Sequence, residues 1–355
     1  MAVAPRVVEA IEFHRAAGAT SPMLRALLDA TLADIARGGP CADVLSHVDD
    51  SLEPLADAVT LRFVGAVHRV VLEGGAPELA RYYPSVGGTF SADEPGDLAS
   101  TFVTAVAAHA DEIIDGLRKP VQTNEVGRSA SLLPGYLAVA SATGLPLRTL
   151  EIGASAGLNL RWDHYRYEGG AGGSVWGDAH AGLRFTDVYA DPGPDLDVVA
   201  SVADRRGCDA NPIDAGTEEG RLALRAFVWP DQVDRHAWLA AALDIAAGVP
   251  VHVDRADAGE WIDDRLAEPA PGLATVVVHS VVWQYLSAPT RTRILNALAR
   301  AGRQATAGAP LAWLRMEPGA DFSKAAEVSL TTWPGGTERV LARSGYHGRP
   351  VRMLR

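Results

Sequence analysis

The sequence LEIGASAGLNL, residues 150–160, places a glycine-rich turn directly after a short apolar run. The run PLRTLEIG (146–153) is typical of a buried strand, and the small residues that follow let a ligand approach the backbone closely. A helix that begins after such a turn presents N–H groups without intrahelical partners, which suit a nucleotide-like ligand. The stretch therefore predicts a strand, a tight turn and a cofactor site of nucleotide type.

Downstream of this turn, short apolar runs alternate with helical patterns, as in an open α/β sheet. The run Val276-Val277-Val278 is typical of a central parallel strand that is covered on both faces. Further strands are predicted at 197–209, 249–257 and 310–319, and helices at 221–229, 234–248 and 290–302. Gly302 is predicted to end the last of these helices. Two strands around the turn Pro334-Gly335-Gly336 predict an antiparallel C-terminal hairpin.

The residues before 147 carry helical periodicity instead. Leu24, Leu27 and Leu28 recur at three- and four-residue spacing, and glycine and proline pairs separate such stretches. We therefore expect an all-helical N-terminal cap domain over residues 1–119, followed by an α/β domain over 120–355. The cap is expected to cover the substrate pocket rather than to carry an activity of its own.

Residues 161–194 interrupt the alternation of strands and helices with a glycine-rich, aromatic segment. We interpret it as an insertion, with a β-hairpin as the expected form. Its aromatic residues, which include Trp162, Tyr165, Tyr167 and Trp176, form either a wall of the substrate site or a small core of their own.

Composition excludes several classes of protein. The 355 residues are 48% apolar and carry a formal net charge of −12, without a basic stripe, which argues against nucleic acid and anionic membranes as partners. Two cysteines cannot form a disulfide framework, and no metal-ligand spacing of histidine and cysteine occurs. The N-terminus lacks an apolar segment of signal-peptide length, so we expect a cytoplasmic protein. Because the charge disfavours nucleic acid, we expect its substrate to be a small molecule. The sequence does not predict an oligomeric state.

The same turn also spells Gly153-x-Ser155-x-Gly157, the nucleophile-elbow pattern of serine hydrolases. In that interpretation Ser155 attacks an ester or amide, with His347 as its base. The helical character of everything before residue 147 opposes this hypothesis, because the elbow of a hydrolase follows several earlier strands of the same sheet. Ser155 as a small turn residue without chemistry is the simpler alternative.

The pattern Glu151-x-Gly153-x-Ser155-x-Gly157 resembles the first motif of class I methyltransferases that use S-adenosylmethionine (SAM). Ser155 replaces the middle glycine of that motif. The resemblance covers about residues 121–355 and implies a Rossmann-like sheet with SAM as cofactor, bound by Glu151, Gly153, Ser155 and Gly157. It also implies that Asp209 holds the ribose and that Asp257 reads the adenine. Asp209 lies much further from Glu151 than the roughly 20 residues of a compact nucleotide-binding unit, which the insertion explains. The same spacing leaves Asp195, Asp197 and Asp204 as alternatives for the ribose ligand.

The whole chain is also similar to an uncharacterised bacterial domain-of-unknown-function family, number 2332. The similarity is carried by the segments PVQTNEVGRS (120–129), LEIGASAGLNLRWDHYRY (150–167), RRGCDANPID (205–214), FVWPDQ (227–232), VVVHSVVWQY (276–285) and WLRMEP (313–318). This family implies a fold and no particular reaction.

Methyl transfer to an amine or hydroxyl needs a base near the ends of the strands. His279 directly follows Val278, and Glu125 lies in the polar segment 122–129, so these two are the candidate catalytic residues. Candidate substrate-binding residues are Asn124, Arg128, Gln284 and Tyr285.

Each candidate has a structural alternative. His279 can donate a structural hydrogen bond, and segment 122–129 can be a helix start capped by Thr123 or Asn124. Glu317, at the end of the strand 310–319, is expected to pair with an arginine. At the level of function, the alternative is a methyltransferase-like protein that binds a ligand or catalyses another reaction without methylation.

Overall fold

The computed structural model describes residues 3–17, 21–49, 51–53, 57–319 and 325–354. The chain forms two compact units: residues 1–123 with 217–237, and residues 124–216 with 238–355. The predicted boundary at 119/120 lies close to the first division. The segment 217–237, which the sequence placed in the α/β domain, instead belongs to the helical unit.

The first unit is helical in its described residues. Its elements are α1 (Pro5–Ala17), α2 (Pro22–Ala36), α3 (Pro40–Leu45), α4 (Val59–Leu72), α5 (Pro77–Ala80), the 3-10 turn η1 (Pro84–Val86), α6 (Leu98–Ala108), α7 (Ala110–Leu117) and α9 (Glu218–Ala226). The helix α2 begins at the N-cap Ser21, whose side chain accepts a hydrogen bond from the Leu24 amide. In the core, Phe63 of α4 and Phe102 of α6 meet edge to face with ring centroids 6.1 Å apart.

Two contacts explain why α9 packs in the helical unit. Arg69 of α4 forms an ion pair with Glu219, with Nη1 and Oε1 2.8 Å apart. The buried ring of His68 lies 3.1 Å from the Ala226 carbonyl oxygen through Nδ1. Because α9 packs against a helix that lies about 150 positions earlier in the chain, no local sequence pattern indicates the contact. The domain prediction therefore did not place α9 in the helical unit.

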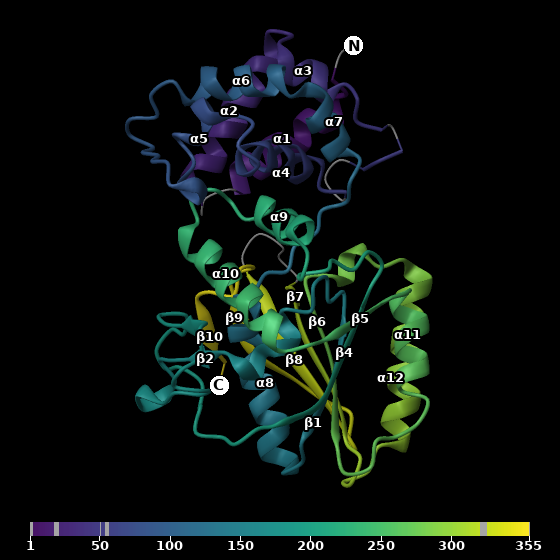
Figure 1. Cartoon of the computed structure of the whole chain (residues 1–355). Coiled ribbons are helices and arrows are strands. Elements are labelled where there is room, and N and C mark those ends of the chain that lie inside the picture. Colours follow the sequence, from purple (N-terminus) through teal and green to yellow (C-terminus); the bar gives the residue numbers. More distant parts are fainter. Residues whose placement is uncertain (1–2, 18–20, 50, 54–56, 320–324, 355) are drawn as a thin grey trace. The chain divides into compact units, whose positions relative to one another are not determined.

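The second unit is built on an eight-stranded sheet in the order β10-β9-β8-β7-β6-β1-β4-β5 (Figure 1). The strands are β1 (Leu147–Ile152), β4 (Val202–Asp209), β5 (His252–Arg255), β6 (Ala274–Ser280), β7 (Leu311–Pro318), β8 (Ala326–Trp333), β9 (Thr337–Ser344) and β10 (Val351–Met353). The five strands from β5 to β7 are parallel, and β8, β9 and β10 continue the sheet antiparallel. This confirms an α/β sheet with an antiparallel C-terminal part.

Strand β1 lies where the order of the parallel strands reverses. The chain continues from β1 to its neighbour β4 on one side and later returns to place β6 on the other side. In open α/β sheets, ligands bind outside the carboxyl ends of the strands at such a switch point. The glycine turn follows β1 directly, so the fold puts it at this position.

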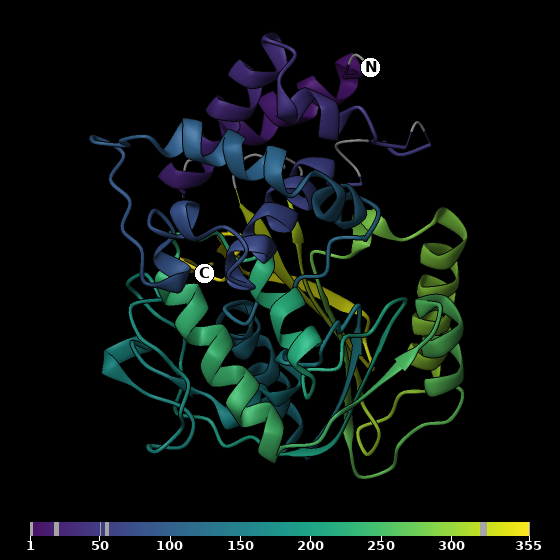
Figure 2. The same cartoon turned by 45° about the horizontal axis from the view of Figure 1, so that its top comes forward.

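Helices cover both faces of the sheet, as Figures 1 and 2 show. Leu150, Val277 and Trp313 pack on one face with α11 (Ala258–Arg265) and α12 (Ala288–Gln304). The other face carries α8 (Arg128–Thr143), where Gly135 leaves room for the side chain of Leu314. Neighbouring strand residues alternate between these two layers, as a doubly covered sheet requires.

The predicted end of the last helix at Gly302 is wrong, because α12 continues to Gln304. A Cβ atom at Gly302 would lie 2.6 Å from Nε1 of Trp333. The glycine therefore permits close packing of α12 under the Trp333 ring, and it does not end the helix.

The insertion 161–194 forms no hairpin. Its strands β2 (Arg166–Tyr167) and β3 (Arg184–Phe185) pair in parallel, beside the 3-10 turns η2 (Asn159–His164) and η3 (Ala171–Gly173). Trp162 is fully buried and stacks on Tyr136 of α8, with ring centroids 4.3 Å apart. Of the two roles predicted for the aromatics, Trp162, Tyr165 and Tyr167 take the role of a local core.

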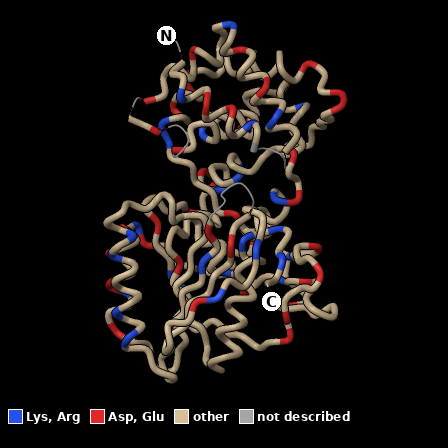
Figure 3. Tube along the Cα trace, turned by 180° about the vertical axis from the view of Figure 1, so that it is seen from behind, with Lys and Arg blue, Asp and Glu red and all other residues tan. Residues whose placement is uncertain are grey.

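Lys and Arg positions are interspersed with Asp and Glu positions along the trace of each unit, as Figure 3 shows. Among the described residues, no helix has the length and apolar character needed to cross a membrane. The same residues contain no cluster of three histidine, cysteine, aspartate or glutamate side chains placed to hold a metal ion.

Candidate functional site

The turn after β1 adopts left-handed backbone conformations at three positions. The φ angles are +68° at Gly153, +52° at Ser155 and +66° at Gly157. In the loop after the neighbouring strand β6, Val281 has a φ of +51°. A β-branched residue rarely adopts this conformation, and such strain is concentrated at functional sites. The two strained loops meet at the switch point of the sheet.

Gly153 fixes the contact between these two loops. A Cβ atom at this position would lie 2.6 Å from Cγ2 of Val282. A residue with a Cβ atom therefore fits here only if the Val282 side chain, or the loop that carries it, moves. From the sequence, we interpreted the small residues of this turn as leaving room for a ligand. The structure shows that Gly153 also leaves room for the loop after β6.

The backbone amides of the turn already have partners within the chain. The Ser155 amide donates to Oδ2 of Asp209 at 2.9 Å, and the Leu158 amide donates to Oδ1 of Asn124 at 2.8 Å. The amides of Ala154 and Gly157 donate to the carbonyl oxygens of Cys208 and Ala154. The predicted set of available N–H donors is therefore largely used in shaping the turn.

The element after the turn is the 3-10 helix η2, and not an α-helix. The backbone of η2 departs from helical geometry at Arg161, where φ is −102° and ψ is 18°. The guanidinium of Arg161 donates through Nη1 to the Gly157 carbonyl oxygen at 2.8 Å and so folds back onto the turn. A short 3-10 element lacks the aligned dipole of a long helix, so binding at this turn must rely on other groups.

Glu151 is the acidic residue at the end of β1. Its side chain is only 3% exposed, and its Oε2 atom is buried without a hydrogen-bond partner among the described residues. Burial raises the pKa of Glu151 to about 8, and the negative charge of Asp209 acts in the same direction. An unsatisfied carboxyl oxygen in this position is an acceptor for a polar group that the protein itself does not supply.

Asp209 and Asp257 end up in different surroundings. Asp209 lies at the carboxyl end of β4 and binds the glycine turn and, through Oδ1, the Asn211 amide. Asp257 caps α11: its Oδ1 accepts hydrogen bonds from the amides of Gly259 and Glu260, and its Oδ2 accepts one from the Thr290 hydroxyl. Burial alone would raise the pKa of Asp257, but the hydrogen bonds from Thr290 and the two amides outweigh it and lower that pKa.

The polar segment 124–128 connects the ends of β1 and β6. Asn124 holds the glycine turn, and the Glu125 carbonyl oxygen accepts a hydrogen bond from the Asn159 amide group at 3.2 Å. Arg128 donates through Nη1 to the Ser280 carbonyl oxygen at 3.0 Å, next to the strained loop. The expected cap by Thr123 or Asn124 is wrong, because α8 begins at Arg128 with Gly127 as its N-cap residue.

Glu125 also forms a pair that the sequence did not reveal. Its Oε2 atom lies 2.9 Å from Nδ1 of His347, a residue 222 positions away in the loop between β9 and β10. The Glu125 side chain is buried, whereas that of His347 is 32% exposed. A carboxylate on one ring nitrogen orients an imidazole and raises its basicity at the other nitrogen. No local pattern marks such a pair, although each residue had been singled out separately.

His279 is fully buried. Its Nδ1 atom lies 2.6 Å from Oε1 of Glu317, and its ring stacks on Trp283 with centroids 5.3 Å apart. The pairing of Glu317 with an arginine, expected from the sequence, is therefore wrong. Glu317 also accepts hydrogen bonds from the Val282 and Trp283 amides, so the pair holds the loop after β6 in place.

The remaining candidates are Gln284, Tyr285 and Ser155. Gln284 and Tyr285 belong to the 3-10 turn η4 (Trp283–Tyr285) and are exposed. Ser155 is only 2% exposed, and its backbone is tied on both sides, through its amide to Asp209 and through its carbonyl oxygen to the Ile213 amide. A serine nucleophile needs an accessible hydroxyl, so this burial does not favour the hydrolase.

A comparison with protein-family models matches residues 10–353 to a family described as "Uncharacterized protein conserved in bacteria (DUF2332)". No curated protein and no solved structure matches the chain.

Proposed function

We propose that this chain, which belongs to the DUF2332 family, binds SAM at the carboxyl edge of its sheet and methylates a small molecule. The proposal rests on the resemblance of the motif at 151–157 together with one observation: the buried, unpartnered Oε2 atom of Glu151 beside a strained glycine turn. Both features lie at the switch point, where open α/β sheets bind their ligands.

The residues at this edge fit the proposed cofactor in part. Glu151 supplies a buried carboxyl oxygen as an acceptor for an N–H group, and glycine at 153 and 157 keeps these two positions of the turn free of side chains. Asp209 fixes the turn and keeps carboxylate lone pairs for further donors. When bound, SAM supplies an electrophilic methyl group, so the protein has only to hold the acceptor in line and to exclude water.

A base is needed when the methyl acceptor is an amine or hydroxyl. In this proposal His347 takes the acceptor's proton at Nε2, while Glu125 on Nδ1 orients the ring and stabilises the imidazolium. His279 is less suited to this role, because its ring is fully buried between Trp283 and Trp313. Its pairing with Glu317 positions the loop that meets Gly153.

A second candidate function is supported by a different observation. The turn amides are used within the chain, and both oxygens of Asp257 are also used: Oδ1 caps α11 and Oδ2 accepts a hydrogen bond from Thr290 of α12. These features favour a methyltransferase-like protein that binds another ligand or catalyses a reaction without methylation. The two candidates share the fold and differ in whether an adenosyl ligand binds.

Calorimetric titration of the full chain with SAM and with S-adenosylhomocysteine separates the two candidates. The proposal predicts saturable binding of both ligands at one site per chain. Folded protein that binds neither ligand would reject SAM-dependent methyl transfer and favour the second candidate. Fluorophosphonate labelling of the same preparation tests the serine hydrolase, which predicts stoichiometric modification of Ser155.

A further inference from the structure

A separate cavity of about 560 Å³ lies in the second unit, on the β4–β5 side of the glycine turn. Its volume is in the range of small-molecule sites. The apolar part of its lining includes Ala156, Ala246, Pro250 and Val251, and the charged part includes Arg161 and Asp214. Ala156 of the glycine turn lines this cavity, whereas Glu151, Gly153, Gly157 and Asp209, the residues named for the proposed SAM site, do not.

Arg161 is a buried cation, with only 5% of its surface exposed. Its Nε atom donates to the Val249 carbonyl oxygen at 2.8 Å, and Nη1 donates to the carbonyl oxygens of Gly157 and Ala156. Within the described part of the chain, Arg161 forms no ion pair, and its Nη2 atom donates no hydrogen bond. The neighbouring Arg205, by contrast, is paired with Asp163 at 2.6 Å.

A buried charge without a counter-ion is costly, and such charges in proteins are normally paired. The three backbone hydrogen bonds hold the guanidinium at the cavity wall before any ligand arrives. A planar guanidinium is suited to carboxylates, which it binds through parallel N–H donors. Asp214 in the same lining adds negative charge, which disfavours a ligand with several charges.

We propose that this cavity binds a small monocarboxylate with an apolar body, and that Arg161 holds the carboxylate group. The apolar side chains of the lining contact the body of the ligand, and the ligand supplies a negative charge within reach of Arg161. This inference does not depend on methyl transfer, because it concerns a different part of the unit and a ligand without an adenosyl group.

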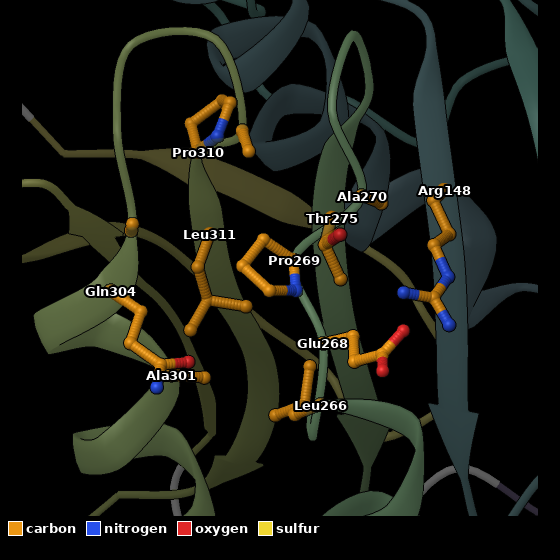
Figure 4. Close-up of a pocket in the computed structure, with 12 residues that line it drawn as sticks. Arg148, Leu266, Glu268, Pro269, Ala270, Thr275, Ala301, Gln304, Pro310 and Leu311 are labelled. Carbon is orange, nitrogen blue, oxygen red and sulfur yellow. The ribbon is translucent and has the colours of Figure 1, made fainter.

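The structure offers a matched control at the opposite edge of the sheet. Arg148 also lines a cavity, at the amino ends of β1, β6 and β7 (Figure 4). That cavity measures only about 20 Å³, which is room for one water molecule. Arg148 is paired there, with Nε 3.6 Å from Oδ2 of Asp204. Of these two arginines, only Arg161 lies beside a large cavity without an ion pair.

The test is a calorimetric titration of the full chain with octanoate, with 1-octanol as the uncharged probe of equal chain length. We expect octanoate to bind at one site, at least tenfold more tightly than octanol. Arg161→Gln is expected to weaken octanoate at least tenfold, whereas Arg148→Gln leaves its affinity unchanged. Equal affinity for the acid and the alcohol, or no octanoate binding, would overturn the proposal.

Arg161→Gln also removes hydrogen bonds to the turn, so a second variant keeps the test decisive if that protein does not fold. Ala246→Phe fills the cavity from its lining and leaves Arg161 intact. We expect this variant to fold and to lose octanoate binding by at least tenfold. Wild-type affinity in the folded Ala246→Phe protein would show that octanoate binds elsewhere and would contradict the assignment.

Discussion

Asp209 accepts a hydrogen bond from the backbone amide of Ser155, with 2.9 Å between Oδ2 and the amide nitrogen. This bond ties the end of β4 to the turn that follows β1, its neighbour in the sheet. It also satisfies an amide in a residue held at a φ of +52°. The acidic residue that the resemblance assigned to a ribose thus shapes the turn in the structure.

Asp209→Ala should therefore loosen the turn. The amides of Ser155 and Asn211 would lose their acceptor, and we expect a loss of about 1–3 kcal/mol in unfolding free energy. Adenosyl ligands should bind more weakly as well. Urea titration checks the first effect and calorimetry the second. Unchanged stability in this variant would show that the bond contributes nothing to the fold.

Glu151→Gln should change how stability depends on pH. The pKa of Glu151 rises from an ordinary value of 4.5 to about 8 in the fold, mainly because the side chain is buried. The folded chain therefore holds a proton that the unfolded chain has released, and the resulting stabilisation is full below the ordinary pKa and is lost as the pH rises to about 8.

The slope from this one group is at most about 1.4 kcal/mol per pH unit. Urea titrations from about pH 5 to pH 9 should show that the wild type loses stability with rising pH relative to Glu151→Gln. The exposed Glu94 provides a control, since we expect Glu94→Gln to have the same slope as the wild type. Parallel curves for the wild type and Glu151→Gln would rule out a protonated Glu151.

Ser155→Gly should be tolerated. Glycine adopts a φ near +52° without the steric cost that serine bears, although it gains freedom in the unfolded chain. We expect a stability change within about 1 kcal/mol and an unchanged affinity for S-adenosylhomocysteine. A fluorophosphonate should not label the wild type. Labelling that the substitution abolishes would instead identify a serine hydrolase.

Asp257→Ala should destabilise the start of α11 by about 0.5–2 kcal/mol, because it removes an N-cap. Asp257→Ser keeps a capping oxygen and should restore much of that stability. The role in adenine recognition implied by the resemblance predicts something else: Asp257→Ser would then bind S-adenosylhomocysteine more weakly by about 1–3 kcal/mol while remaining stable. Calorimetry on the serine variant distinguishes the two roles.

The sequence predicted the parallel strands and the turn because buried strands produce uninterrupted apolar runs, as in Val276-Val277-Val278, and because left-handed positions select glycine. It did not predict what depends on distant residues. Glu317 meets His279 across 38 positions, and Glu125 meets His347 across 222. Gly302 misled the prediction because glycine serves close packing as well as helix ends.

The sequence suggested that a helix begins after the turn, but the structure has the 3-10 helix η2 there. The reason is local, and hydrophobic periodicity does not show it. The backbone at Arg161 is not helical, and its guanidinium donates a hydrogen bond to the backbone of the turn. Trp162, which follows it, packs against Tyr136 of α8. Glu151, Asp209 and His279 lie near the carboxyl ends of their strands, as the sequence predicted, while the partners of their side chains emerged only from the three-dimensional structure.

The most direct test of the proposed function compares two glycines with similar backbone conformations. Gly153 has a φ of +68° and a Cβ there would meet Val282, whereas Gly144 has a φ of +64° and has no atom within 4 Å of such a Cβ. Calorimetric titration with S-adenosylhomocysteine should show binding to the wild type and to Gly144→Ala, and at least tenfold weaker binding to Gly153→Ala. Equal affinity in all three proteins, or no binding to the folded wild type, would contradict an adenosyl site at this turn.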